Sequence, residues 1–216
     1  MRLDWYLYED CFRYCHFVEN SSKRGRTAMK LYYAPQTRAI RPLIMLEELA
    51  VPYEMVMVDF KGGEHRSVEY RKIHPHGQLP ALQDGTLTMF ESAAICAYLA
   101  DKFPDKRMAP ALGTVERGMY YQWMFYSMAA LEGFALDRER MKECFLVLDR
   151  VLSGREYVVG DKMTAADVMI GSGVIYLDAR HHLLNDFPSL DAYAKRLLAR
   201  PSFQCAFAPP AELARH

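Results

Sequence analysis

Residues 75–92 read Pro-His-Gly-Gln-Leu-Pro-Ala-Leu-Gln-Asp-Gly-Thr-Leu-Thr-Met-Phe-Glu-Ser and contain the most informative local signals of the chain. Asp84-Gly85 lies between two apolar segments, which is a strong short-range signal of a β-hairpin. Glu91-Ser92 then opens an apolar-periodic segment, so a helix is predicted to follow. We predict a cis peptide bond before Pro80, which would leave the backbone N–H and C=O of Leu79 free to pair with an extended peptide. The stretch therefore predicts a site that holds a small peptide by its main chain.

Composition excludes several classes of function. The chain has 216 residues, of which 51% are hydrophobic, so it can bury the core of one large or two small domains. Its formal net charge is zero, which favours neither nucleic acid nor an anionic membrane surface as a partner. No apolar run reaches the ~18 residues that a membrane span needs. A cytoplasmic protein with no nucleic-acid and no membrane partner is expected.

Residues 1–28 differ from the rest of the chain: aromatic residues crowd the first part, and a polar, basic run follows. Charged residues interrupt every apolar run, which is not typical of a secretory signal. We interpret the segment as an atypical extension from a start placed too early, or alternatively as a docking segment. Cys11 and Cys15 resemble half of a zinc site, but no second ligand pair follows at metal-binding spacing. Free thiols and no metal are therefore expected.

From Met29 onward the pattern changes from mixed to helical. Strands are predicted over 30–34, 53–58, 80–83 and 86–90, and helices over 37–49 and 92–103. A β-α-β unit followed by a hairpin and a helix predicts a small mixed sheet, because the crossover is right-handed. The turn-rich residues 105–113 predict a linker. Helices are then predicted over 114–136, 138–153, 164–181 and 189–199. The predicted organisation is an α/β domain over 29–104 and an all-helical domain over 114–216.

Several motifs in this order are characteristic of one family. They are Leu31-Tyr-Tyr-Ala-Pro35, His74-Pro-His-Gly-Gln-Leu-Pro-Ala-Leu82, Glu91-Ser-Ala-Ala-Ile95, Gly160-Asp-Lys-Met-Thr-Ala-Ala-Asp167, and Phe187-Pro-Ser-Leu-Asp-Ala-Tyr193 with Arg200-Pro201. Residues 29–208 resemble a cytosolic glutathione S-transferase of bacterial type. The resemblance implies a thioredoxin-like N-terminal domain, an all-helical C-terminal domain and a homodimer. It also implies glutathione, a tripeptide, as co-substrate.

The resemblance assigns the parts of glutathione to particular residues. Glu91 would hold the amino group of the γ-glutamyl end, and the hydroxyl and backbone N–H of Ser92 would hold its carboxylate, helped by the positive end of the helix. Leu79, before Pro80, would pair its backbone with the cysteinyl part. Gln78 would reach the glycyl end.

Three residues are candidates for stabilising the glutathione thiolate, which is the nucleophile. Thr37 lies where serine-type relatives keep a hydroxyl, Arg38 would favour an anion, and Tyr33 aligns with the tyrosine of tyrosine-type relatives. Lowering the pKa of a thiol by about two units takes roughly 2.7 kcal/mol. We expect Thr37 to act first, with Arg38 assisting and Tyr33 as the alternative.

The electrophile is expected between the domains, along the predicted helix 114–136. Its aromatic and methionine-rich face would form a hydrophobic site, although such a face is also typical of a packed core. The residues of this face are Tyr120, Trp123, Met124 and Ser127. Asp167 resembles a helix cap and is assigned to stability.

The predicted function is conjugation of the glutathione thiolate to hydrophobic electrophiles. The same site could instead serve a glutathione-dependent isomerase, peroxidase or dehalogenase. A third possibility is a transferase-like module that binds ligands or proteins without catalysis, because one fold serves many functions.

Overall fold

The computed structural model describes residues 29–207, and the expectations for residues 1–28, including Cys11 and Cys15, lie outside the described residues. The chain divides into two compact units, with boundaries after Leu99 and Arg200. Among the described residues, the first unit holds 29–99 and 201–207, and the second holds Ala100–Arg200.

The first unit is built on a mixed four-stranded sheet with the order β2-β1-β3-β4. Its strands are β1 (Met29–Tyr33), β2 (Tyr53–Met57), β3 (Ala81–Asp84) and β4 (Leu87–Phe90). β1 and β2 are parallel, whereas β3 is antiparallel to both β1 and β4. The hairpin around Asp84-Gly85 is confirmed, and Gly85 has the positive φ (59°) that this turn requires. The predicted thioredoxin-like order of elements is therefore present.

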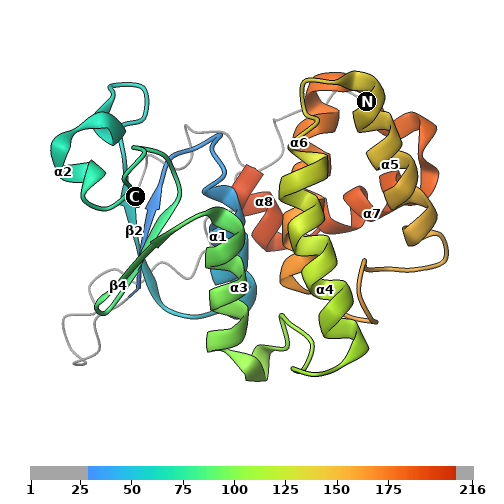
Figure 1. Ribbon diagram of the computed structural model, residues 1–216, viewed down its shortest axis with the longest axis horizontal. Helices are drawn as coiled ribbons and strands as arrows, with labels where there is room; N and C mark the ends of the chain where they lie inside the picture. Colours follow the sequence, from blue (N-terminus) through green and yellow to red (C-terminus); the bar gives the residue numbers. More distant parts are fainter. Residues whose placement is uncertain (1–28, 208–216) are drawn as a thin grey trace. The chain divides into compact units, whose positions relative to one another are not determined.

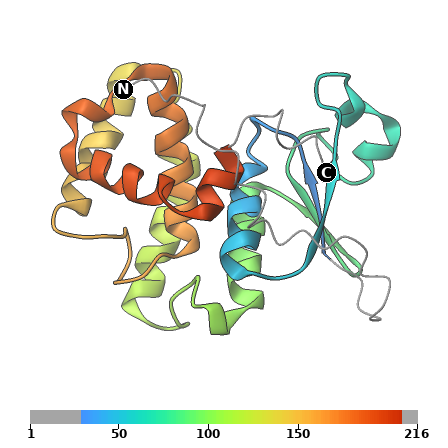
Figure 2. The same cartoon turned by 180° about the vertical axis from the view of Figure 1, so that it is seen from behind.

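Helices cover this sheet. α1 (Ile40–Leu49) and α3 (Ser92–Lys102) lie together on one face, while α2 (Val68–Arg71), preceded by the 3-10 turn η2 (Glu64–Arg66), lies on the other side (Figures 1 and 2). α8 (Pro201–Phe207) packs against α1, and the hydroxyl of Ser202 donates to the Glu48 carboxylate. The side chains of Leu31, Leu43 and Ile95 are completely buried, which shows where the core of this unit lies.

One predicted boundary in this unit was wrong, and one helix was not predicted. α1 begins at Ile40 and not at Thr37, because residues 37–41 form tight turns in which Ile40 N–H donates to Thr37 C=O and Arg41 N–H to Arg38 C=O. Gln36, with a φ of 60°, lies in the left-handed region just before these turns. The predicted helix 189–199 corresponds to α7 (Pro188–Leu198), and a further helix that was not predicted, α8, starts at Pro201. A proline is compatible with a first helical turn because that N–H has no partner in the helix.

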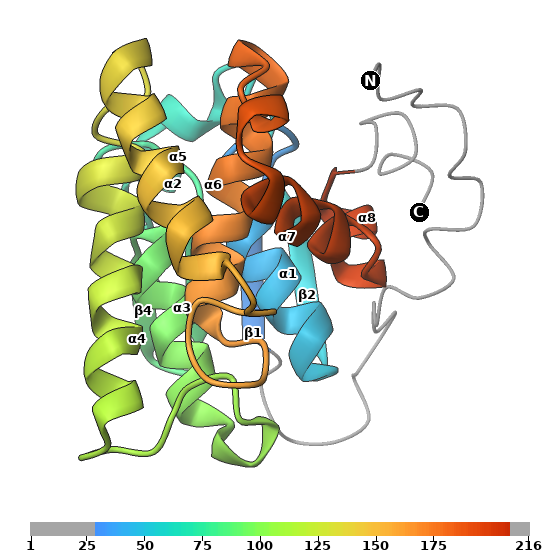
Figure 3. The ribbon, with the colours of Figure 1, turned by 90° about the vertical axis from the view of Figure 1, so that its right-hand side faces the viewer.

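The second unit is all-helical, as predicted. α4 packs against α6, and α5 and α6 each pack against α7 (Figure 3). α6 is buried without interruption from Ala165 to Ile175, so it is the core helix of the unit. None of the helices in the described part of the chain is both long and apolar enough to cross a membrane. The elements are η3 (Pro104–Lys106), α4 (Val115–Tyr126), η4 (Ser127–Leu131), α5 (Arg138–Leu152), α6 (Ala165–His181), η5 (Leu184–Asp186) and α7 (Pro188–Leu198).

The predicted helix 114–136 is shorter and changes its geometry. Regular α-helix ends at Tyr126, and Ser127–Leu131 forms a π-helical turn in which Glu132 N–H donates to Ser127 C=O. Single π-turns of this kind occur frequently at functional sites. The sequence pattern did not predict it, because apolar periodicity continues through the segment.

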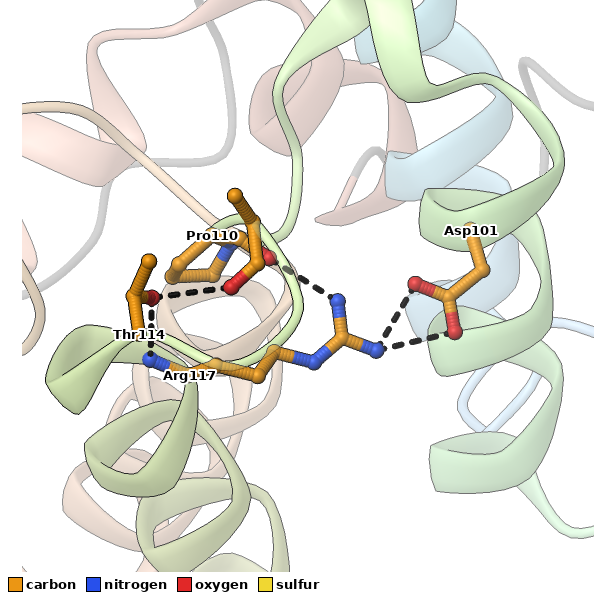
Figure 4. Close-up of polar contacts among 5 residues, drawn as sticks. Asp101, Pro110, Thr114 and Arg117 are labelled. Atoms are coloured by element: carbon orange, nitrogen blue, oxygen red, sulfur yellow. Dashed lines mark hydrogen bonds and ion pairs between the residues drawn. The ribbon is translucent and has the colours of Figure 1, made fainter.

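Arg117 fixes the segment that leads into α4. Its side chain is only 7% exposed, and its Nη2 atom lies 2.8 Å from Oδ1 of Asp101 and 3.0 Å from Oδ2 (Figure 4). Nη1 donates to the Pro110 carbonyl at 3.0 Å, while the hydroxyl of Thr114 accepts from the backbone N–H of Arg117. One guanidinium thus ties the end of α3 to the loop before α4.

Candidate functional site

Three segments far apart in sequence meet at one end of the sheet in the first unit. Tyr32 pairs with Ala81, and Ala81 pairs with Phe90. The pairing ends there, and the next residue of each segment is Tyr33, Pro80 or Glu91. The turn after β1, the Leu79-Pro80 bond and the start of α3 are therefore neighbours, so strand pairing alone assembles most of the predicted site.

Residues of α2 and η2 contact the loop that carries Gln78 and Leu79. The Leu79–Pro80 bond is cis, as predicted. The hydroxyl of Tyr70 donates to the Gln78 carbonyl at 2.8 Å, while the Gln78 side chain is exposed. Gly77 has a φ of 59°, and a Cβ there would lie 2.5 Å from the His65 carbonyl oxygen, so only glycine fits. The close approach of His65 to this loop was not predicted from the sequence.

Glu91 and Ser92 form the start of α3 and differ in exposure. Glu91 is exposed and has a φ of 72°, a conformation that costs a non-glycine residue free energy and that recurs at functional sites. Ser92 is only 2% exposed. The first turn of α3 reads Ser92-Ala-Ala-Ile95, and none of these described residues is acidic. The positive end of the helix is thus not neutralised by its own first turn.

Sequence reasoning missed Arg41. This arginine is the second residue of α1 and is 4% exposed. Its Nη1 atom donates to the hydroxyl oxygen of Ser92 at 3.3 Å. Fifty-one positions separate the two residues in the sequence, so no local motif could have indicated the contact. The only available signal was a charged residue inside the apolar pattern of a helix.

The predicted thiolate-stabilising residues lie around the end of β1. Thr37 is partly buried; its Oγ1 donates to the Ala34 carbonyl at 2.7 Å and accepts from the Ala39 N–H at 3.2 Å. Arg38 is exposed. Tyr33 is completely buried, and burial raises the pKa of its hydroxyl well above the usual value. The structure thus places Thr37 and Arg38 in a surface turn and Tyr33 inside the core.

His74 lies beneath the same region. Its ring is 4.8 Å from that of Phe90, centroid to centroid, and the residue is 3% exposed. Burial lowers the pKa of its imidazole, as does neighbouring His76, whereas the Glu91 carboxylate acts in the opposite direction. His74 is therefore a buried group that resists protonation.

The predicted acceptor-site residues belong to the second unit and share one face of α4 and the following turn. All four are at most 5% exposed: Tyr120, Trp123, Met124 and Ser127. Within residues 29–207, the Trp123 Nε1 atom and the Ser127 Oγ atom have no hydrogen-bond partner. Such buried polar atoms are rare in native structures and call for an explanation. Their part in holding an electrophile stays a prediction.

Comparisons with known proteins agree with this arrangement. Residues 27–101 match the family profile described as "Glutathione S-transferase, N-terminal domain", and residues 119–204 match "Glutathione S-transferase, C-terminal domain". A probable glutathione S-transferase of Oryza sativa subsp. japonica, GSTF2, is 30% identical, with the alignment covering 82% of this chain and 94% of that protein.

Solved structures give the same result. The glutathione transferase URE2P8 of Phanerochaete chrysosporium, determined with oxidized glutathione, has a TM-score of 0.76 at 26% identity and covers 90% of this chain and 100% of its own. A sphingomonad glutathione S-transferase complexed with glutathione has a TM-score of 0.73 at 26% identity, covering 82% of this chain and 96% of its own. Because the relatives come from plants and fungi as well as bacteria, they do not select a bacterial type. From its strand order, its cis-proline loop and both family profiles, the chain belongs to the glutathione S-transferase family.

Proposed function

We propose that this protein binds glutathione at the end of the sheet and conjugates its thiolate to hydrophobic electrophiles. The observation that carries the proposal is the start of α3. A buried hydroxyl, a buried arginine and a first helical turn without an acid lie beside the exposed carboxylate that opens the helix. This arrangement suits a ligand group that bears a carboxylate and an ammonium on one carbon.

The γ-glutamyl end of glutathione would occupy this helix start. Its ammonium would pair with Glu91, and its carboxylate would accept hydrogen bonds from Ser92 and from the first backbone N–H groups of α3. The backbone of Leu79, before cis-Pro80, would pair with the cysteinyl part. Gln78, whose side chain is exposed, would reach toward the glycyl part.

The thiolate would then point toward the turn at Thr37 and Arg38. The Thr37 hydroxyl donates its one hydrogen to the Ala34 carbonyl, so it must rotate away before it can donate to sulfur. The exposed guanidinium of Arg38 would add a favourable charge. Tyr33 is the weaker candidate, because its hydroxyl is buried and holds its proton tightly.

The electrophile would be held by the α4 face of Tyr120, Trp123, Met124 and Ser127. An aromatic face with a methionine suits flat hydrophobic molecules, which would have to displace the groups that now bury it. The same proposal includes a homodimer working in the cytoplasm, as the resemblance implies. Light scattering of the purified chain tests the dimer.

Calorimetry with glutathione, followed by turnover of chloro-dinitrobenzene, tests the proposed function. We expect saturable binding below millimolar concentration and formation of the conjugate. No binding at millimolar glutathione would exclude every glutathione-dependent activity. Binding with turnover of only a hydroperoxide or a halogenated substrate would replace conjugation by the corresponding alternative.

Thr37→Val tests the thiolate assignment with little change in volume. We expect the pH at which bound thiol ionises to rise by about one unit, equivalent to about 1.4 kcal/mol of lost thiolate stabilisation. The thiolate absorbance of bound glutathione, followed against pH, measures this shift. Thr37→Ser, which keeps the hydroxyl, is the matched control. An unshifted profile in Thr37→Val would transfer the role to Arg38 or Tyr33.

A further inference from the structure

We propose that Arg41 is a positioning residue that aims the Ser92 hydroxyl at the α-carboxylate of the ligand and makes the site selective for that carboxylate. The inference rests on the proposed function, since it concerns the γ-glutamyl end of the same site.

The hydrogen bond between Arg41 and Ser92 can have only one direction. Arginine has only donors, so the 3.3 Å contact between Arg41 Nη1 and Ser92 Oγ must use a lone pair of the serine oxygen. A serine hydroxyl has one hydrogen and two lone pairs. With one lone pair taken by Arg41, the hydroxyl hydrogen remains available for a different acceptor. Arg41 therefore makes Ser92 a donor toward a ligand.

Arg41 and Ser92 are both shielded from solvent. Arg41 is 4% exposed and Ser92 is 2% exposed, so solvent screens neither group strongly. A guanidinium stays charged at every physiological pH. Its charge is placed at the N-terminal end of α3, where the helix dipole is also positive. The two effects act together on an anion at this point.

Neighbouring Cys96, on the same helix α3, does not cancel this charge. The nearby guanidinium favours the thiolate, but burial acts more strongly and raises the pKa of the Cys96 thiol to about 12. Cys96 is thus a neutral thiol at physiological pH. Cys96 therefore adds no negative charge beside Arg41.

The charges at the helix start predict what the site selects. Glu91, exposed at the surface, offers a negative charge, and the buried Arg41 with Ser92 offers a positive one. A ligand that keeps the amino group but lacks the α-carboxylate would satisfy only Glu91. The buried arginine would then contribute nothing to binding, so the selectivity resides in Arg41 and Ser92.

A titration of two ligands against Arg41 and Ser92 variants tests this inference. The ligands are glutathione and the analogue in which 4-aminobutyrate replaces the γ-glutamyl residue, which lacks only the α-carboxylate. We expect Arg41→Met to weaken glutathione binding about tenfold or more, as loss of a charge-assisted interaction would. Binding of the analogue should change less than about twofold, since the lost interaction is with the missing group. In a protein that already carries Ser92→Ala, adding Arg41→Met should weaken glutathione binding only slightly further.

Arg150→Met, at an exposed position of α5, is the matched control and should leave both affinities unchanged. If Arg41→Met does not fold, Arg41→Gln keeps a hydrogen-bond donor of reduced length without the charge and should show the same ligand-dependent loss. Equal losses for the two ligands would show a structural role and overturn the inference. Unchanged glutathione affinity in Arg41→Met would overturn it as well. Failure of the unmodified protein to bind glutathione would instead contradict the proposed function itself.

Discussion

The starts of α3 and α6 differ in whether the first turn of the helix contains an acidic side chain. At the start of α6, Thr164 and Asp167 form a capping box, and the Asp167 carboxylate accepts hydrogen bonds from Val158 N–H, Thr164 N–H, the Thr164 hydroxyl and the Tyr193 hydroxyl. At the start of α3, the described first turn contains no acid. The α6 end is satisfied by a buried carboxylate within its own first turn, whereas the acid at the α3 end is the exposed Glu91, which precedes the first turn.

This difference distinguishes polar residues that stabilise the fold from polar residues that can bind a ligand. A buried polar group that is fully paired within the protein holds the protein together but cannot also hold a ligand. A helix end without its own acid is less well satisfied in the free protein and gains from an anionic ligand. We therefore expect changes at α6 to alter unfolding and changes at α3 to alter affinity.

The largest effect is expected from Asp167→Ala. The change leaves several buried donors without an acceptor, so the free energy of unfolding should fall by about 3–5 kcal/mol. Urea unfolding at pH 8 measures this, because burial raises the Asp167 pKa to about 6 and the carboxylate is ionised at pH 8. Asp161→Ala, at an exposed position nearby, is the control and should change stability by less than about 0.5 kcal/mol. A loss of that small size for Asp167→Ala would contradict its role as the cap of α6.

The smallest effect is expected from replacing His74, near the start of α3, and it concerns how stability depends on pH. Its imidazole has a lowered pKa in the folded chain, whereas the unfolded chain has the ordinary value of about 6.5. Below that pH the unfolded state binds more protons, so this group makes stability fall as the pH decreases. His74→Asn should flatten the stability profile between pH 7 and pH 5, measured by urea unfolding. The control His182→Asn, at an exposed histidine, should not flatten the profile. Equal slopes for the unmodified protein and His74→Asn would refute the contribution of His74.

Local turn chemistry made much of the fold predictable. The Asp84-Gly85 hairpin, the cis bond before Pro80 and the Thr164–Asp167 capping box each depend on residues within a few positions of one another. Their outcome is decided by backbone sterics and short-range hydrogen bonds, which a sequence displays directly.

Contacts between distant elements could not be predicted in the same way. Arg41 meets Ser92 only because α1 and α3 pack on the same face of the sheet, and no periodicity in either segment indicates that pair. The π-turn after Tyr126 and the burial of the Trp123 and Ser127 polar atoms depend on tertiary packing. The strand pairs Tyr32–Ala81 and Ala81–Phe90, which place the ends of β1, β3 and β4 side by side, are likewise contacts between distant segments.

Placing an acid at the start of α3 tests the central comparison most directly. Ala94 is exposed and lies three residues after Glu91, as Asp167 lies three residues after Thr164. Ala94→Glu should add a second carboxylate, inside the first turn of α3, and weaken glutathione binding by about 1–2 kcal/mol, through repulsion of the ligand carboxylate. Calorimetric titration of Ala94→Glu beside the neutral Ala94→Gln, at low and at high salt, is the measurement. The predicted result is a loss of affinity in Ala94→Glu alone that shrinks as salt rises, and equal affinities for the two variants would contradict a ligand carboxylate at this helix end.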